Sequence, residues 1–169
     1  MTTLLLPELA RENAASNRRV ARSVDTAASQ PRVTHSAREA LRYSLGQAAL
    51  ARGHWQDVLA LFEDGVEGGE AREAVHAVLD FFDSWFDLAR STRALWQAAG
   101  APGAAPEGLD AATREVEALR RNAEEMRAFL DRPRPPVDPV ALEKARQAVA
   151  QGHYKTPEAV RANLGDRQG

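Results

Sequence analysis

The chain has 169 residues, 44% of them hydrophobic and 27% charged, with a net charge of −2, and this length suits one ordinary core with flanking segments. It contains no cysteine, so disulfide bonds, thiolate metal ligands and cysteine nucleophiles are excluded, and a reducing, cytoplasmic compartment is expected. No window approaches the roughly 20 apolar residues of a membrane span, and no basic residue precedes the N-terminal leucines as in a signal peptide. We expect no contact with a membrane.

The charge is distributed unevenly along the chain. Residues 1–55 hold eight arginines against four acidic side chains, residues 56–131 seven against sixteen, and residues 132–169 seven basic against four acidic. The acidic middle can bind a basic partner, or it can attract the basic ends of its own chain, and the pattern favours the second interpretation.

Residues 1–33 are rich in alanine, arginine, asparagine and serine and have few large apolar side chains after Leu9. Because such a segment has a thin hydrophobic stripe, we expect a marginal helix or a mobile basic arm, which Pro31 separates from the next helix. Four arginines of this arm are candidate phosphate contacts for a nucleic acid: Arg11, Arg18, Arg19 and Arg22. No aromatic side chain lies among them to stack on bases, so an ordinary solvated surface is the favoured alternative.

Residues 34–63 are predicted to form a helix hairpin. Ser36 and Glu39 make a capping box for a helix that runs to about Arg52, and Gly53 separates it from a second helix over residues 54–63. Five residues between 41 and 62 resemble the pattern of a single tetratricopeptide-type unit: Leu45, Gly46, Gly53, Trp55 and Phe62. In that pattern Gly46 allows the two helices to approach closely and Gly53 forms the turn. The resemblance implies an isolated hairpin, because an array needs about three repeats.

Residues 69–97 are predicted to form the central helix of the fold, which we call the hub helix. Apolar side chains cover most of its circumference: Val75, Val78, Leu79, Phe81, Phe82, Trp85, Phe86, Leu88, Ala89, Leu95 and Trp96. Such a helix must be wrapped by others. Its one polar stripe contains His76, Asp80, Asp83 and Asp87. This spacing could hold a divalent ion, but a solvated face is favoured because no ligands come from a second helix.

The segment from Gly100 to Gly108 is too rich in proline and glycine to be helical. Asp110 then caps an amphipathic helix that runs to about Leu130 and should pack antiparallel to the hub helix. The apolar stripe of this helix consists of Val116, Leu119, Met126, Phe129 and Leu130.

Residues 132–138 contain three prolines and predict an extended spacer before a short C-terminal unit, residues 139–169. In this unit a helix from Pro139 to Gln151 ends at Gly152, and Thr156 opens a second short helix. The unit is too small to be stable alone, so we expect it to dock on its own domain or on a partner. Its candidate partner-binding residues are the apolar Leu142, Val149, Tyr154, Val160 and Leu164 and the basic Lys144, Arg146, Lys155 and Arg161.

The stretch from Ala141 to Val160 reads ALEKARQAVAQGHYKTPEAV, and its helix, glycine, aromatic, threonine and Glu-x-Val succession resembles the tail of small bacterial antitoxins. The resemblance implies a tail that wraps a basic, ribonuclease-type toxin or helps to form a DNA-binding dimer. It covers about 25 residues, and nothing elsewhere in the chain matches the DNA-binding elements of that family.

We therefore expect an all-α protein with a small helical bundle (residues 34–131) built around a long aromatic-rich helix, and with a proline-tethered C-terminal helix pair. No catalytic triad order, phosphate loop or HExxH motif is present in the sequence, so we expect a non-catalytic interaction or regulatory protein without catalytic residues, metal or cofactor. We expect the partner to be another protein. It could be a basic or toxin-like protein, and the chain could also form a homo-oligomer. An antitoxin-like neutraliser or DNA-binding regulator is the alternative, and a metal-dependent hydrolase is third.

Overall fold

A computed structural model of the chain describes residues 5–27, 33–66, 68–100, 106, 108–133 and 138–152. These residues form five α-helices and no strand, which confirms the all-α prediction: α1 (Leu5–Ala27), α2 (Val33–Glu63), α3 (Gly69–Ala98), α4 (Leu109–Leu130) and α5 (Pro139–Ala150). The chain divides into two compact units, Met1–Asp131 and Arg132–Gly169. The first unit contains α1 to α4 and the second contains α5.

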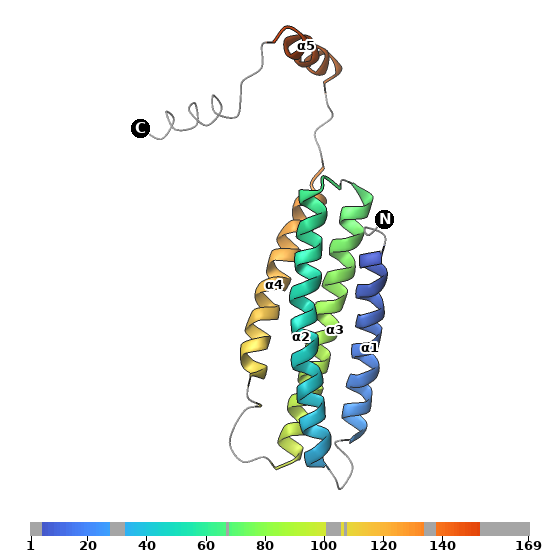
Figure 1. Ribbon diagram of the computed structural model, residues 1–169, viewed down its shortest axis with the longest axis vertical. Helices are drawn as coiled ribbons and strands as arrows, with labels where there is room; N and C mark the ends of the chain where they lie inside the picture. The colour runs from blue at the N-terminus through green and yellow to red at the C-terminus, as the bar shows by residue number, and fades with distance from the viewer. Residues whose placement is uncertain are drawn as a thin grey trace, which may run out of the picture. The chain divides into compact units, whose positions relative to one another are not determined.

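The first unit is an up-and-down bundle in which α1 and α3 run in one direction and α2 and α4 in the other (Figure 1). Helix α3 contacts each of α1, α2 and α4, and α2 also contacts α1 and α4. Within the described residues α1 and α4 do not touch, so they cover opposite sides of the central α2–α3 pair. Short connections between antiparallel neighbours produce this arrangement.

Helix α3 is the predicted hub, and its side chains are buried around nearly its whole circumference. Trp85, Phe81 and Phe82 are fully buried. The indole Nε1 of Trp85 donates a hydrogen bond of 2.9 Å to the carbonyl oxygen of Ser44 on α2, and the hydroxyls of Ser44 and Thr92 lie 2.8 Å apart. The polar end of the large aromatic side chain therefore has a partner, as a buried tryptophan requires.

Helix α2 is continuous through Gly53, so the predicted hairpin is wrong. Glycine inside a helix costs about 1 kcal/mol relative to alanine, but the helix buries Ala48, Ala51, Trp55 and Val58 on both sides of Gly53. This burial outweighs the local preference for a turn. The glycine that was expected to allow close helix packing, Gly46, lies on the exposed side of α2.

The N-terminal segment is helix α1 of the bundle, so the prediction of a mobile arm over residues 1–33 is wrong for residues 5–27. Its buried residues are mostly small: Leu6, Pro7, Ala10, Ala14, Asn17, Ala21 and Val24. Small side chains let the backbone of α1 approach α3 closely, so a thin stripe is sufficient when α3 supplies the large apolar groups. Sequence patterning alone could not reveal this, because the large side chains lie on the partner helix.

Helix α4 follows Gly108, whose φ of 85° is left-handed, and it packs antiparallel to α3 as predicted. Val116 and Ala123 are fully buried, and Leu119, Met126 and Leu130 are partly buried against the same core. Phe129 was expected in this apolar stripe, but its side chain is 66% exposed. It lies at the outer edge of the stripe, about 100° around the helix from Leu130, which does pack against the core.

In the second unit, α5 begins as predicted, because the backbone N–H of Val140 donates a 2.9 Å hydrogen bond to the Asp138 carboxylate. This side-chain cap satisfies one of the free amides at the start of the helix. Gly152 has a left-handed φ of 73° and follows the end of α5. The helix predicted to open at Thr156 lies outside the described residues.

Replacing Trp85 by alanine should reduce the free energy of unfolding by about 3 to 5 kcal/mol, because the change leaves a cavity at the centre of the bundle. Urea unfolding followed by circular dichroism measures this loss. Phe129→Ala is the control, since an exposed side chain should change stability by no more than about 1 kcal/mol. Equal losses in the two variants would contradict the central position of Trp85.

Replacing Gly46 or Gly53 by alanine should raise the free energy of unfolding by about 0.5 to 1 kcal/mol each. Both residues lie within α2, and a Cβ atom at either position would meet no heavy atom within 4 Å. Thermal and urea denaturation measure the gain. A loss of stability at Gly53→Ala would instead indicate the turn that the sequence pattern suggested.

Candidate functional site

The predicted partner-binding residues that the structure describes lie on α5. Leu142 is 42% exposed, and Lys144 and Arg146 are exposed on the same helix. Position 149 belongs to α5, but the side chain of Val149 lies outside the described part of the chain. So do five further candidates: Tyr154, Lys155, Val160, Arg161 and Leu164.

Helix α5 carries two different exposed apolar positions. At about 100° per residue, Leu142 and Ala145 lie on one face with Arg146 at its edge, whereas Val140 lies on the opposite face. Val140 is 61% exposed. The prediction of one apolar surface thus applies to the Leu142 face. Val140, on the opposite face of the same helix, is a control position for substitutions at Leu142.

The four arginines proposed as phosphate contacts do not form one free basic cluster. Arg11 forms an ion pair of 2.8 Å with Glu73, and Arg18 forms one with Asp80. The hydrogen bond that Arg18 donates to Asp80 is the largest cause that raises the pKa of Arg18, and burial acts in the opposite direction. Arg19 and Arg22 are exposed. Two of the four side chains therefore attach α1 to α3, which counts against a nucleic-acid surface along α1.

The polar stripe of α3 is not simply a solvated face, because its aspartates pair with arginines. Asp80 binds Arg18 of α1, Asp83 binds Arg120 of α4 at 2.9 Å, and Asp87 binds Arg90 within α3 at 3.2 Å. His76, the fourth member of the stripe, is exposed. Adjacent aspartates of one stripe thus bind the helices on its two sides.

Similar ion pairs lie along the other helix contacts. Arg93 of α3 pairs with Asp110 of α4 at 2.8 Å, and Arg72 pairs with Asp131 at the end of α4 at 2.9 Å. Arg52 of α2 and Glu115 of α4 form a two-bond contact at 2.6 and 3.0 Å. The hydrogen bond from Arg52 is the largest cause that lowers the pKa of Glu115.

The spacing of the polar stripe on α3 could suit metal ligands, but the described residues do not form a metal site. Among them, no group of three or more histidine and acidic side chains is arranged to hold a metal ion. The three stripe aspartates have arginine partners instead.

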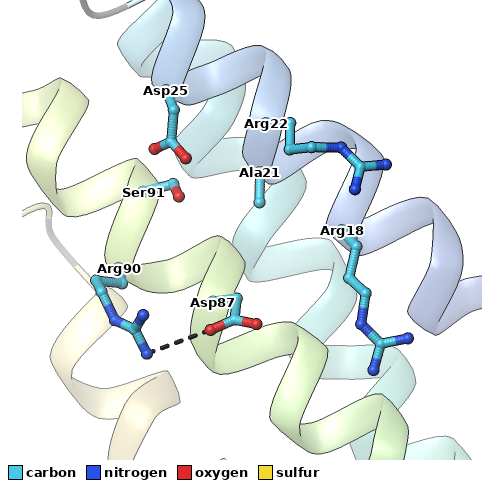
Figure 2. Close-up of a pocket in the computed structure, with 7 residues that line it drawn as sticks. All are labelled: Arg18, Ala21, Arg22, Asp25, Asp87, Arg90 and Ser91. Atoms are coloured by element: carbon cyan, nitrogen blue, oxygen red, sulfur yellow. Dashed lines mark ion pairs between the residues drawn. The ribbon is translucent and has the colours of Figure 1, made fainter.

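A charged hollow of about 310 Å³ lies between α1 and α3. Figure 2 shows the residues that line it: Arg18, Ala21, Arg22, Asp25, Asp87, Arg90 and Ser91. The pairs Arg11–Glu73 and Arg18–Asp80 share an offset of 62 residues, and in Figure 2 Asp25 of α1 lies beside Ser91 of α3. The hollow thus contains three arginines and two carboxylates, and Asp87 pairs with Arg90 of its own helix.

A second groove of about 400 Å³ lies near the other edge of α1 and is mostly apolar. Its lining comes from α1, α2 and α3: Val20, Ser23, Val24, Ala27, Ser36, Glu39, Ala40, Tyr43 and Leu95. Five of these residues belong to a small core cluster that is separate from the main core: Val20, Val24, Ala27, Ala40 and Leu95.

The structure also reveals a buried polar cluster that the sequence did not indicate. His54 was expected at a turn, yet only 3% of it is exposed. Its Nε2 accepts a 3.1 Å hydrogen bond from Asn13 of α1, and its ring meets Phe81 of α3 edge-on at 4.9 Å. Burial lowers the pKa of His54, while the charge of Asp57 acts in the opposite direction. Only the continuity of α2 through Gly53, which the pattern hid, places His54 in the interior.

No described helix is long and apolar enough to cross a membrane. No family model matches the chain, and neither a curated protein nor a solved structure shows significant similarity to it.

A double-mutant cycle on Arg18 and Asp80 should give a favourable coupling of about 0.2 to 1 kcal/mol that weakens in high salt, as partly exposed ion pairs do. The variants are Arg18→Gln, Asp80→Asn and their combination, compared by urea unfolding. Arg19→Gln with Asp80→Asn is the control cycle, because Arg19 is exposed and has no ion pair within the described residues. Equal coupling in the two cycles would restore the solvated-face interpretation.

Proposed function

We propose that this chain is a non-catalytic helical protein that binds a macromolecular partner, another protein, through its C-terminal unit and the surface of its bundle. The observation that carries this proposal is the surface of α5. Val140 and Leu142 are 61% and 42% exposed, in a unit separate from the bundle. An isolated helix of this size is marginal in water, so it gains stability mainly by packing its apolar face against something else.

The chemistry of α5 favours a partner with an acidic rim around an apolar groove. Arg146 flanks the Leu142 face, Lys144 lies on the Val140 side of the helix, and Glu143 accepts a 3.4 Å hydrogen bond from Gln147. Residues 132–169 carry seven basic and four acidic side chains. Basic residues around a small apolar anchor speed association and set orientation, while the buried anchor supplies most of the affinity.

The bundle supports this proposal as a scaffold. Its core is filled by aromatic and aliphatic side chains from α2, α3 and α4, and its ion pairs hold neighbouring helices together. Exposed side chains such as Phe129 leave additional apolar surface on the same unit. We therefore assign the bundle a structural and surface-presenting role, with no chemical step.

Truncation after Asp131 should keep helicity and a cooperative melt, because residues 1–131 already form a compact unit with its own core. Capture of the partner in affinity purification with mass spectrometry should be lost. If the truncated protein loses its cooperative melt and still captures the same proteins, the C-terminal unit belongs to the core and the proposal is wrong.

A finer test replaces single side chains in the full chain. Leu142→Asp should weaken capture by tenfold or more, as removal of an interface anchor does, whereas Val140→Asp on the opposite face should have little effect. Circular dichroism should show unchanged helicity in both variants. Equal effects of the two changes would exclude the Leu142 face as the binding surface. A ribonuclease-type partner would favour the antitoxin-like alternative, and an unrelated protein would exclude it.

A further inference from the structure

The contact between α1 and α2 is unusually polar for the inside of a helical bundle. Asn13 of α1 bonds His54 of α2 at 3.1 Å, and the hydroxyls of Ser16 and Tyr43 lie 3.2 Å apart. In the same bundle the α2–α3 contact is built around the buried indole of Trp85. Helix α1 is thus joined to α2 by hydrogen bonds between side chains, whereas the hydrogen bonds of the α2–α3 contact accompany large buried aromatic side chains.

Two acceptors near this contact are unsatisfied. Asn17 is fully buried, and its Nδ2 donates to Ser84 of α3 at 3.2 Å. Neither its Oδ1 nor the Oε1 of Gln47 has a hydrogen-bond donor within the described part of the chain. A buried acceptor without a donor costs free energy. The contact of α1 with its neighbouring helices, which we call the seam, is therefore less stabilising than its burial suggests.

The groups around His54 favour its neutral form. Helix α1 presents the uncharged Asn13 amide, α3 presents the ring of Phe81, and the acidic group that acts on His54 is Asp57 of α2. On the other two helices Arg11 is paired with Glu73 and Asp80 with Arg18, and Glu12, which precedes Asn13, is exposed. Burial is the largest influence and lowers the pKa of His54 below its ordinary value of 6.5.

We propose that α1 is an acid-releasable cover of the α2–α3 pair, and that protonation of His54 loosens it. Among the described residues no acidic group of α1 or α3 pairs with the charged imidazolium, since Asp57 lies on α2 itself, and the Nε2–H faces the Asn13 amide donor unless that amide group rotates. Release of α1 lets water reach the imidazolium. Three of the seven buried residues of α1 are alanine, which buries little apolar area per residue, so α1 can open transiently while the helices beneath it remain folded.

The direction of the pH effect follows from proton binding. His54 takes up a proton more readily when α1 is released than when it is docked, so acid favours the released form. The effect begins as the pH falls through 6.5, the ordinary pKa of the side chain. At pH 5.5 the opening equilibrium of α1 can rise by at most about tenfold relative to neutral pH.

Hydrogen exchange with mass spectrometry on the full chain tests the proposal, at pH 7.5 and pH 5.5, with rates corrected for the intrinsic effect of pH. Protection of α1 amides should fall severalfold, up to about tenfold, at pH 5.5, while protection of α4 should not change. Unchanged protection of α1 would overturn the proposal. An equal loss in α1 and α4 would also overturn it, because it would indicate unfolding of the whole bundle.

Two variants assign the effect to one side chain. His54→Gln keeps an acceptor for Asn13 but carries no proton, so its α1 protection should be the same at both pH values. His76→Gln removes an exposed histidine of α3 and should behave as the wild type. A pH-dependent loss that survives in His54→Gln would show that another group controls α1. The comparison of the wild-type protein at the two pH values already decides the proposal, so the test does not depend on the variants folding. It is independent of partner binding by α5.

Discussion

The fold depends on one constraint, which is that α3 must be covered on all sides. A helix with Phe81, Phe82, Trp85 and Leu88 all fully buried has no face to give to water, so three other helices pack against it. Helices α1 and α4 reach it from opposite sides, and α2 completes the cover. The buried side chains of the covering helices can be small because α3 contributes most of the large apolar groups. Helix α1 is the clearest case, since three of its seven buried residues are alanine.

Ion pairs then define how each helix meets α3. The hydrophobic effect has no direction along a helix axis, whereas a paired arginine and aspartate fix a register. Asp80 and Asp83, only three positions apart, bind Arg18 of α1 and Arg120 of α4. Each exposed pair contributes little stability, so we attribute to them the choice of register more than the strength of the bundle. The seam between α1 and α2 has buried polar groups instead, and this difference makes α1 the helix that acid is proposed to release.

The two units suit different roles. The bundle satisfies most of its own apolar surface, and its charged residues are largely used between its helices. Helix α5 leaves apolar and basic side chains exposed. A protein that binds through a short segment and keeps its core intact can change partner specificity without loss of fold stability.

The sequence by itself determined the all-α class, the central position of the helix at 69–98, the antiparallel α4 and the start of α5 at Asp138, because hydrophobic periodicity, caps and prolines are local signals. Only the tertiary structure decided the rest. Gly53 indicated a turn, but burial on both sides of it kept α2 straight and carried His54 into the core. The thin stripe of α1 indicated a marginal helix or a mobile arm, and the acidic stripe of α3 indicated a solvated face, on which His76, Asp83 and Asp87 are exposed. For α1 and α2 the deciding energy came from burial against the other helices, which no local pattern contains.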